Sequence, residues 1–384
     1  MNALESGPAR LPDGEGVAVS DGVPLAWASY GDGPTTVLLM PAWSIVNSRM
    51  WKAQVAYLAR HVRVVTFDGR GSGRSGRPLD AAGYTDEQYA DDTVAVLDAA
   101  GVDRAVLVGL SCGASWSIRV AAGHPDRVQG IVAIGAACGF PVAHPERDQY
   151  VWSQRYEAYE GWAKYNKHHW LNGGYDDFVR FFMAEMFPEP HSTKQIEDAT
   201  GWGLDVEPEV LAAATAGRLG CDGATCTPLE PLCARVRCPV LAIHGTDDHV
   251  RTHAISERLA ELTGAEWGMV SAGCAAAMSH ATAACVAGGN PDLHVRIPNL
   301  AGFPRDEVII PTHSRNVYDA AIRAVGVKII EVDSPEALQL AIGPKTAMIY
   351  LFAGPRTDSG PMSTEAICGI AKQYKVPVFV DAAA

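Results

Sequence analysis

The chain has 384 residues, of which 48% are hydrophobic and 20% are charged, and its formal net charge at pH 7 is −13. This length predicts two domains, and the composition is typical of a soluble globular protein. The acidic balance argues against a nucleic acid or an anionic membrane as a partner, and no apolar run approaches the ~20 residues that span a bilayer.

Up to residue 243 the chain alternates between short apolar runs and helical patterns. Strands are expected at 37–40, 62–67, 105–110, 130–134 and 239–243. A helix is expected from Asp86, because Thr85 and Gln88 form a capping box before it and Gly101 ends it. Continuous apolar strands separated by helices predict a parallel sheet that is covered on both faces, and therefore an α/β fold.

The strand expected at 105–110 runs into Gly109-Leu110-Ser111-Cys112-Gly113, which is a G-x-S-x-G turn. Small residues on both sides let the backbone bend sharply, and a serine at such a bend projects its hydroxyl out of the sheet. Ser111 is therefore a candidate nucleophile. The alternative is that Ser111 is only a small residue at a tight turn.

Residues from about 145 to 230 break the alternation of strands and helices and are rich in aromatic side chains. The aromatic residues are Tyr150, Trp152, Tyr156, Tyr159, Trp162, Tyr165, Trp170, Tyr175, Phe178, Phe181, Phe182 and Phe187. We interpret this stretch as a helical cap over the edge of the sheet. Most of these side chains are expected to pack the cap's own core, and the others to line an apolar pocket for a small-molecule substrate.

Four motifs, taken in order, make residues from about 16 to 263 resemble the α/β-hydrolase fold family. They are Asp68–Ser75 (DGRGSGRS), the turn around Ser111, His124–Val128 (HPDRV) and His244–Asp248 (HGTDD). The resemblance implies a hydrolase domain over 1–263 that uses a Ser–His–Asp triad and needs no cofactor. It implies that Asp248, rather than its neighbour Asp247, is the acid, and the alternative role for Asp248 is that of a loop-capping carboxylate.

In such a triad a histidine takes the serine proton, a carboxylate orients the histidine, and two backbone N–H groups hold the oxyanion. The resemblance assigns these N–H groups to Trp43 and Cys112. It puts the histidine near position 276, where the sequence has none. His280 is the nearest candidate base, in a segment that looks helical, and a histidine without a catalytic role is the alternative. His249 and His253 are too close to the acid to fold back onto it.

From about residue 264 a new series of strands is expected, at 308–310, 328–332, 348–352 and 376–380. Residues 264–384 resemble part of the large domain of fold-type I pyridoxal-phosphate (PLP) enzymes, nearest to the selenocysteine-synthase-like group. The resemblance implies a phosphate-binding turn at Gly273 and Cys274, and a carboxylate, Asp381, that pairs with the pyridinium nitrogen. The alternative for the turn is a helix N-terminus without a ligand, and Asp381 also has a non-binding alternative. Because the Schiff-base lysine would lie beyond residue 384, PLP binding is not favoured.

Two further patterns are interpreted without a ligand. The first comprises Cys221, Cys226, Cys233 and Cys238, whose spacing fits no common zinc module, so no metal site is expected. The second, Gly71–Gly76, satisfies G-x-G-x-x-G but does not open into a helix, as a dinucleotide site requires. The odd count of nine cysteines, together with a start that lacks a signal-peptide pattern, predicts a reduced, cytoplasmic protein.

The sequence thus predicts a hydrolase that acts on an ester or related small apolar acyl substrate. A fusion near residues 259–266 would have replaced its histidine segment with part of a PLP enzyme, and the hydrolase would be inactive if no histidine completed the triad. The alternatives are a fragment of a PLP-dependent transferase or lyase, and a non-catalytic binding protein with the hydrolase fold.

Overall fold

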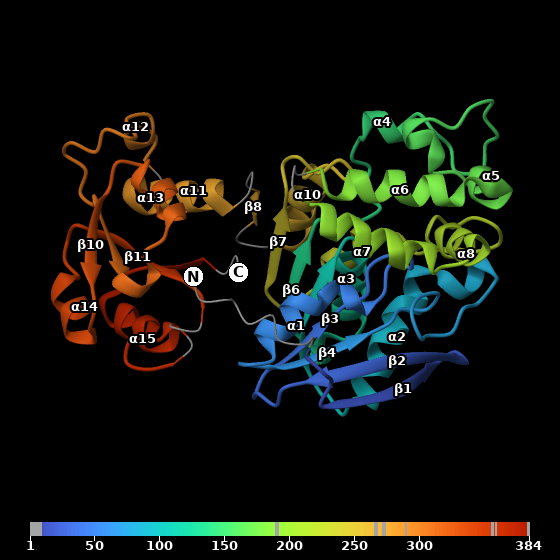
Figure 1. Cartoon of the computed structure of the whole chain (residues 1–384), viewed down its shortest axis with the longest axis horizontal. Helices are drawn as coiled ribbons and strands as arrows, with labels where there is room; N and C mark the ends of the chain where they lie inside the picture. Colours follow the sequence, from blue (N-terminus) through green and yellow to red (C-terminus); the bar gives the residue numbers. More distant parts are fainter. Residues whose placement is uncertain are drawn as a thin grey trace. The chain divides into compact units, whose positions relative to one another are not determined.

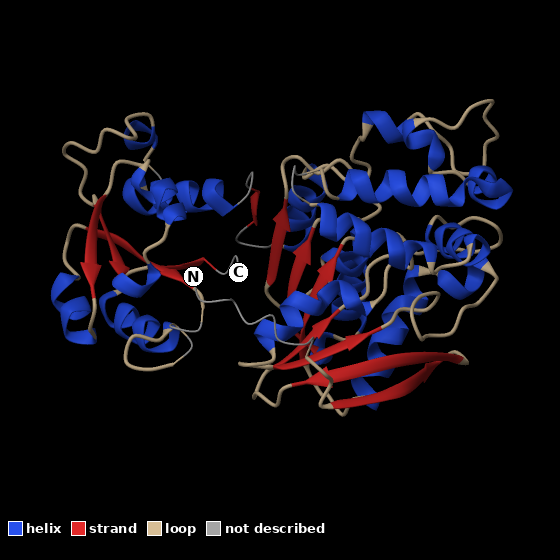
Figure 2. Cartoon of the chain, in the orientation of Figure 1, coloured by secondary structure: helices blue, strands red, loops and turns tan. Residues whose placement is uncertain are grey.

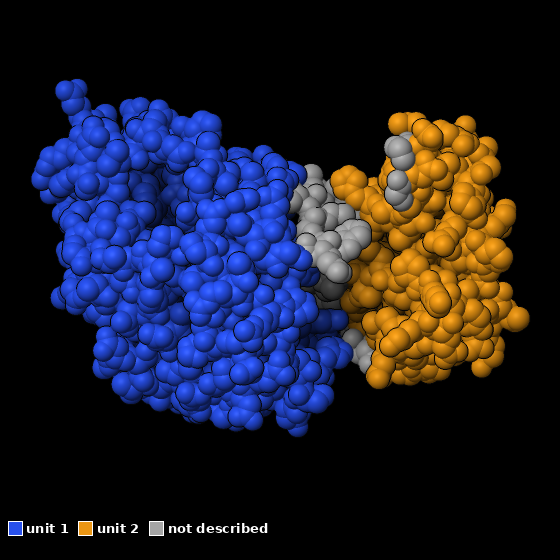
Figure 3. Space-filling model, turned by 180° about the vertical axis from the view of Figure 1, so that it is seen from behind, with its two compact units in different colours: residues 1–269 blue, residues 270–384 orange. Residues whose placement is uncertain are grey.

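The computed structural model describes residues 10–188, 192–264, 268–270, 274–288, 290–354, 357 and 359–381. The chain forms two compact units, residues 1–269 and residues 270–384 (Figure 3). The boundary expected from the sequence, between residues 263 and 264, lies just before this division. Each unit has a sheet and hydrophobic clusters of its own.

The first unit is built on an eight-stranded sheet with the strand order β1-β2-β4-β3-β5-β6-β7-β8. Its strands are β1 (Gly14–Ser20), β2 (Val23–Tyr30), β3 (Thr36–Leu39), β4 (Arg63–Phe67), β5 (Ala105–Leu110), β6 (Val128–Ile134), β7 (Val240–His244) and β8 (Gly268–Val270). All neighbouring strands from β4 to β7 are parallel, as predicted. The ends of these parallel strands form the edge at which the candidate site lies.

The antiparallel hairpin of β1 and β2, which pairs with β4, was not expected from the sequence. In β1 the side chains of Val17 and Val19 are exposed, whereas Ala18 is buried. The larger apolar side chains of this strand thus face solvent instead of the core. For this reason the pattern of hydrophobic residues did not predict the strand. The signal that could have revealed it is Asp21-Gly22, because both residues have positive φ and connect two strands as a two-residue turn.

Helices cover both faces of the parallel core, as predicted (Figure 2). They include α1 (Lys52–Leu58), α2 (Asp86–Ala99), α3 (Cys112–Gly123) and α10 (Ala254–Thr263). Successive residues of a strand face opposite sides of the sheet. In β3, Val37 packs in a cluster with α1, and Leu38 packs in the large core cluster that contains α2 and α3.

The segment between β6 and β7 is a helical cap, which Figure 1 shows in green to yellow-green beside the strand ends. Its helices are α4 (Pro145–Asp148), α5 (Lys167–His169), α6 (Tyr175–Met186), α7 (Thr193–Leu204), α8 (Pro208–Arg218) and α9 (Glu230–Cys233). Trp162, Trp170 and Phe178 are among its buried aromatic side chains, and the ring centroids of Trp170 and Phe178 lie 4.3 Å apart. These aromatic side chains form a core for the cap.

The second unit has a four-stranded parallel sheet with the order β10-β9-β11-β12. Its elements are α11 (Cys274–Ala287), α12 (Pro291–His294), β9 (Glu307–Pro311), α13 (Ala320–Arg323), β10 (Lys328–Val332), α14 (Pro335–Ala341), β11 (Thr346–Phe352), α15 (Thr364–Tyr374) and β12 (Val378–Asp381). In β9, Val308 packs with α11 and α13, and Ile309 packs with α14 and α15. Across the described residues of both units, no helix is long and apolar enough to cross a membrane.

Candidate active site

Ser111 lies at a sharp turn between β5 and α3, where the G-x-S-x-G motif occurs. Its backbone has φ 56° and ψ −116°, a conformation that is uncommon for residues other than glycine. Two hydrogen bonds hold the turn to the neighbouring strand end. The Ser111 N–H donates to the Ile134 carbonyl at 2.9 Å, and the Ser111 carbonyl accepts from the Ala137 N–H at 3.1 Å. A turn of this kind lifts the serine hydroxyl clear of the strand ends.

The two glycines of the motif are required by close approaches of the backbone. A Cβ atom on Gly109 would lie 2.3 Å from the carbonyl carbon of Gly113, and one on Gly113 would lie 2.5 Å from the carbonyl oxygen of Pro41. Both obstacles are main-chain atoms, which cannot move aside as a side chain can. The helix α3 therefore packs directly against β5 and the loop after β3, and this packing fixes the position of Ser111.

Two backbone N–H groups near Ser111 are unused within the described part of the chain. Cys112 is the first residue of α3, so its N–H has no partner inside the helix, and Trp43 lies in the loop after β3. The N-terminal end of a helix favours negative charge. These are the two groups that the family resemblance assigned to the oxyanion hole.

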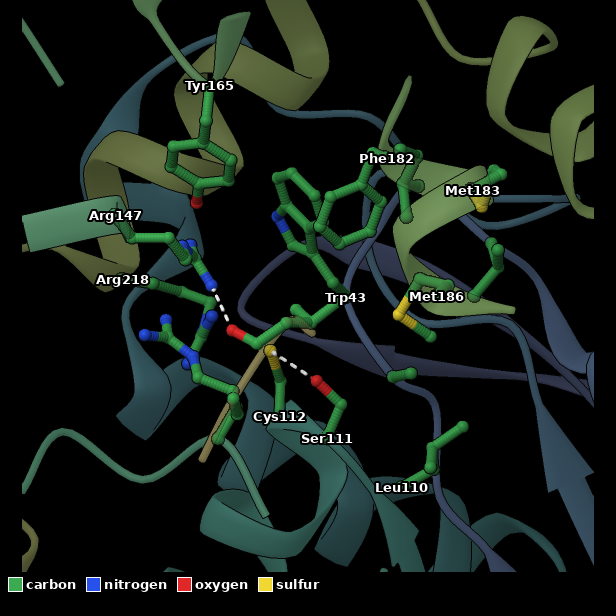
Figure 4. Close-up of a pocket in the computed structure, with 16 residues that line it drawn as sticks. Trp43, Leu110, Ser111, Cys112, Arg147, Tyr165, Phe182, Met183, Met186 and Arg218 are labelled. Atoms are coloured by element: carbon green, nitrogen blue, oxygen red, sulfur yellow. Dashed lines mark hydrogen bonds between the residues drawn. The ribbon is translucent and has the colours of Figure 1, made fainter. Parts of the chain in front are cut away.

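A cavity of about 60 Å³ opens at Ser111 (Figure 4). From the first unit's core it is lined by Trp43, Leu110, Ser111 and Cys112, and from the cap by Arg147, Tyr165, Phe182, Met183, Met186 and Arg218. In Figure 4 the two arginines lie on one side of Ser111, and Phe182 and the methionines lie on the other. The cavity therefore has a cationic end and an apolar end.

Asp248 follows β7, and three donors hold its carboxylate. Oδ1 accepts from the backbone N–H groups of Val250 and Arg251, both at 2.8 Å. Oδ2 lies 3.1 Å from Nε2 of His244. Burial acts to raise the pKa of Asp248, but these hydrogen bonds outweigh it and lower the pKa below its usual value. The carboxylate is therefore stabilised in its charged form. The side chain of Asp247, by contrast, is 91% exposed.

His244 has a position at this site that the sequence analysis did not predict. It is buried at the end of β7, with Nδ1 2.7 Å from Oγ of Ser256, and with Nε2 3.1 Å from both Asp248 Oδ2 and the Arg251 carbonyl oxygen. Both ring nitrogens are engaged, and His244 does not line the cavity. Its sequence signal is a histidine that ends a strand shortly before the acid.

The other histidines considered for the base lie elsewhere. His280 is exposed on α11 of the second unit, so the first unit by itself does not contain it. His249 is exposed and pairs with Glu185, with Nδ1 3.1 Å from the carboxylate. Nε2 of His253 lies 3.8 Å from Oε1 of Glu257. Among the described residues, no histidine lines the cavity.

Three arginines at the cavity, Arg147, Arg218 and Arg251, were also missed. Arg147 and Arg218 belong to the cap, and Arg251 follows the acid. The Nη1 of Arg147 donates to the Val250 carbonyl at 2.6 Å, which links the cap to the loop that holds Asp248. A single basic residue in a helical pattern usually indicates an exposed charge. The local sequence therefore gave no reason to place these residues at a site.

In the second unit, Asp381 ends β12 and is buried, and the hydroxyl of Tyr350 donates to its Oδ2 at 3.0 Å. Gly273 and the side chain of Cys274, which were expected to hold the PLP phosphate, lie outside the described residues. The lysines in the described part of this unit are Lys328, Lys345, Lys372 and Lys375, and all are exposed. They precede or begin the parallel strands, whereas Asp381 ends one. The lysines therefore lie at the edge of the sheet opposite to Asp381, and these residues do not fit a covalently held PLP.

Comparison with known proteins gives the family of the chain. A model of the alpha/beta hydrolase fold family matches residues 35–278. The chain belongs to this family. It is 36% identical over 114 residues to the 2-hydroxymuconate semialdehyde hydrolase of Pseudomonas sp. (strain CF600). The aligned stretch covers 29% of this chain and 37% of that protein. It is 25% identical over 242 residues to 3-oxoadipate enol-lactonase 2 of Acinetobacter baylyi. That alignment covers 62% of this chain and 81% of the enol-lactonase.

The chain spans only about a third of the length of several curated hydrolases that it matches. Among solved structures, it is similar to the enol-lactonase from Burkholderia xenovorans LB400, with a TM-score of 0.54 and 23% identity. That similarity covers 66% of this chain and 90% of the enol-lactonase, and it shows the shared fold.

Proposed function

We propose that this chain is a serine hydrolase that cleaves an ester or a related acyl bond in a small substrate, with Ser111 as its nucleophile. The observation that carries the proposal is the strained turn at Ser111, which opens onto a covered cavity near the unused N–H groups of Trp43 and Cys112. Backbone strain of this kind is concentrated at active sites. The names of two related proteins, a semialdehyde hydrolase and an enol-lactonase, fit the same class of reaction.

In the proposed reaction, Oγ of Ser111 attacks the carbonyl carbon of the substrate and gives its proton to a base. The carbonyl oxygen becomes an oxyanion, which accepts hydrogen bonds from the N–H groups of Trp43 and Cys112. The bond between the carbonyl carbon and the leaving alcohol then breaks, and the protonated base gives its proton to the alcohol. Water hydrolyses the acyl-enzyme by the same steps and restores the free serine.

The proposed base is His280, and the proposed role of Asp248 is to orient the histidine that acts as base. If no histidine completes the triad, Ser111 keeps its cavity and its oxyanion donors but has no partner to take its proton. The chain would then be a non-catalytic binding protein with the same fold. The two proposals differ in the reactivity of Ser111 and agree on the shape of the site.

The test is the reaction of the full chain with a fluorophosphonate probe, followed by intact-mass spectrometry. A single adduct is expected on the parent protein, none on Ser111→Ala, and an undiminished adduct on Ser153→Ala, because Ser153 is exposed and away from the cavity. Hydrolysis of p-nitrophenyl acetate should fall by roughly 10³-fold or more in Ser111→Ala. A folded parent protein that gives no adduct would contradict the hydrolase proposal and favour the binding protein.

A second comparison tests the base. His280→Ala should slow labelling by roughly 10²-fold or more, and His124→Ala, which alters another exposed histidine, should leave the rate unchanged. Equal labelling rates for the parent protein and His280→Ala would remove His280 from the mechanism while leaving Ser111 in it.

For the second unit we propose a domain separate from the hydrolase domain, over 264–384, and no PLP chemistry. Two observations support this proposal. The unit has a sheet of its own, and its lysines lie at the edge of that sheet opposite to Asp381. A visible absorbance band in the purified chain after incubation with PLP would contradict this. Peptide mapping across residues 255–275 in the native source tests whether the two domains are one chain, and two separate proteins there would overturn the fusion.

A further inference from the structure

The polar side chains at the cavity are almost all hydrogen-bond donors. Its lining contains Arg147, Arg218 and Arg251 but no aspartate or glutamate among the described residues. Figure 4 shows the hydroxyl of Tyr165 directed toward Arg147, and the indole nitrogen of Trp43 on the side of the ring that faces Arg147. Among the described residues, this end of the cavity therefore offers a ligand several donors and no carboxylate.

Arg218 is the arginine whose charge is already balanced. Its Nε donates to Oδ1 of Asp86 at 3.0 Å, and the same carboxylate accepts from Nε1 of Trp116 at 2.8 Å. Arg218 therefore supplies a wall of the cavity without requiring an anion.

Arg147 has no such partner. Its guanidinium lies over the rings of Trp162 and Tyr165, 4.4 and 5.0 Å from their centroids. Within the described part of the chain, its one hydrogen bond goes to a neutral carbonyl, that of Val250. No carboxylate of the described residues forms an ion pair with it. Burial, and then the charge of Arg251, lower the pKa of Arg147 below its usual value. The guanidinium of Arg147 thus has no direct carboxylate partner among the described residues.

Arg251, in the loop after β7, also lacks a carboxylate partner among the described residues. Its backbone N–H donates to Asp248 Oδ1 at 2.8 Å, and the residue lines the cavity. Its side chain has no ion pair or hydrogen bond to any described residue. Nε1 of Trp43 is also buried without a hydrogen-bond partner in the described part of the chain. A buried N–H without a partner is costly, so an acceptor in the cavity would relieve it.

We propose that Arg147 and Arg251, with the indole N–H of Trp43, bind a carboxylate of the substrate. This inference rests on the proposed function and deepens it, because it makes the substrate a small acyl compound that carries a carboxylate in addition to the bond that is cleaved. A planar guanidinium matches a carboxylate with two parallel hydrogen bonds, and two guanidinium groups together favour an anion over a neutral amide or ester. Phe182, Met183 and Met186 at the other end then take the apolar part of the substrate.

The test is a ligand-observed NMR titration with propionate, the neutral analogue propionamide, and inorganic phosphate, in a Ser111→Ala background that removes turnover. Propionate is expected to bind roughly tenfold or more tightly than propionamide and inorganic phosphate. Arg147→Gln and Arg251→Gln should each weaken propionate binding by roughly 30-fold. The matched control is Arg155→Gln, which removes an exposed cap arginine that does not line the cavity and should leave binding unchanged.

Equal binding of propionate and propionamide would overturn the carboxylate site, and so would a preference for phosphate. Unchanged propionate binding in both arginine variants would overturn it as well. Arg251 serves as the second variant if Arg147→Gln does not fold. The outcome is distinguishable from that of the proposed function, because binding is measured without Ser111. A chain that binds propionate through these arginines but gives no fluorophosphonate adduct would support the carboxylate site and contradict the hydrolase.

Discussion

Each unit has a carboxylate at the C-terminal end of a strand in a parallel sheet, and the two carboxylates have different surroundings. Asp248 follows β7, accepts hydrogen bonds from two backbone N–H groups and His244, and adjoins a loop that lines a cavity beneath the cap. Asp381 ends β12 and accepts a hydrogen bond from Tyr350 of the neighbouring strand β11. A parallel sheet therefore brings a carboxylate to its edge in both cases, and the segments that cover that edge decide whether a site for chemistry forms.

The largest effect is expected at the turn that distinguishes the edge of the first unit. In Gly109→Ala the new methyl group would overlap the backbone of Gly113 and Ala114, at 2.3 to 2.5 Å, and no side chain can move to make room. We expect a loss of roughly 3 kcal/mol or more in the free energy of unfolding, confined to the transition of the first unit. Urea unfolding followed by tryptophan fluorescence measures it.

The matched control for this variant is Gly123→Ala. Gly123 is the last residue of α3, and a methyl group there would meet no atom within 4 Å. It should be neutral or stabilise by up to about 1 kcal/mol, because alanine restricts the unfolded chain more than glycine does. Equal stability of the two variants would mean that β5 and α3 do not approach as closely as described.

The next effect concerns the charge of Asp248. Because the fold lowers the pKa of this carboxyl, its contribution to stability is fully present above the unfolded-state pKa of about 3.9 and is lost as the pH falls through the folded-state pKa. Asp248→Asn should therefore lower the free energy of unfolding by about 2 kcal/mol at pH 7 and by much less near pH 3. The measurement is urea unfolding over that pH range.

The control is Asp247→Asn, which alters the neighbouring, exposed carboxyl. Its free energy of unfolding should change by no more than about 0.5 kcal/mol at every pH. A penalty for Asp248→Asn that stays constant from pH 7 to pH 3 would show that the shape of the loop, rather than the charge, depends on this residue.

Local patterns predicted much of the fold. The apolar run of β5 and the G-x-S-x-G turn mark Ser111, and the capping box before α2 is present, with the Thr85 hydroxyl accepting from the Gln88 N–H at 3.4 Å. The hairpin of β1 and β2 was missed because Val17 and Val19 face solvent, so the period-2 pattern points the wrong way. Patterns of hydrophobicity find a strand only when its buried face is its apolar face.

The candidate site was predictable where a residue is tied to a strand end, and not where it depends on packing over a distance. Ser111 follows β5 directly, and Asp248 lies in the loop that follows β7. Arg147 and Arg251 come to one cavity only because the cap folds onto the sheet, and His244 gains its contacts with Asp248 and Ser256 only when the loop after β7 turns back. The contacts of the two arginines correspond to no spacing in the sequence.

The smallest effect is expected at the carboxylate of the second unit. Tyr350→Phe removes the hydroxyl that donates to Asp381 at 3.0 Å and accepts from Asn316 Nδ2 at 3.3 Å, while the ring can still stack near Phe379. We expect a loss of about 1 kcal/mol in the free energy of unfolding of this unit, the usual net value of a buried hydrogen bond, and no change in fluorophosphonate labelling of Ser111. Tyr374→Phe, which alters an exposed ring on α15, should change stability by less than about 0.5 kcal/mol. If Tyr350→Phe instead slowed the labelling of Ser111, the edge of the second sheet would take part in the chemistry of the first, and the contrast between the two carboxylates would fail.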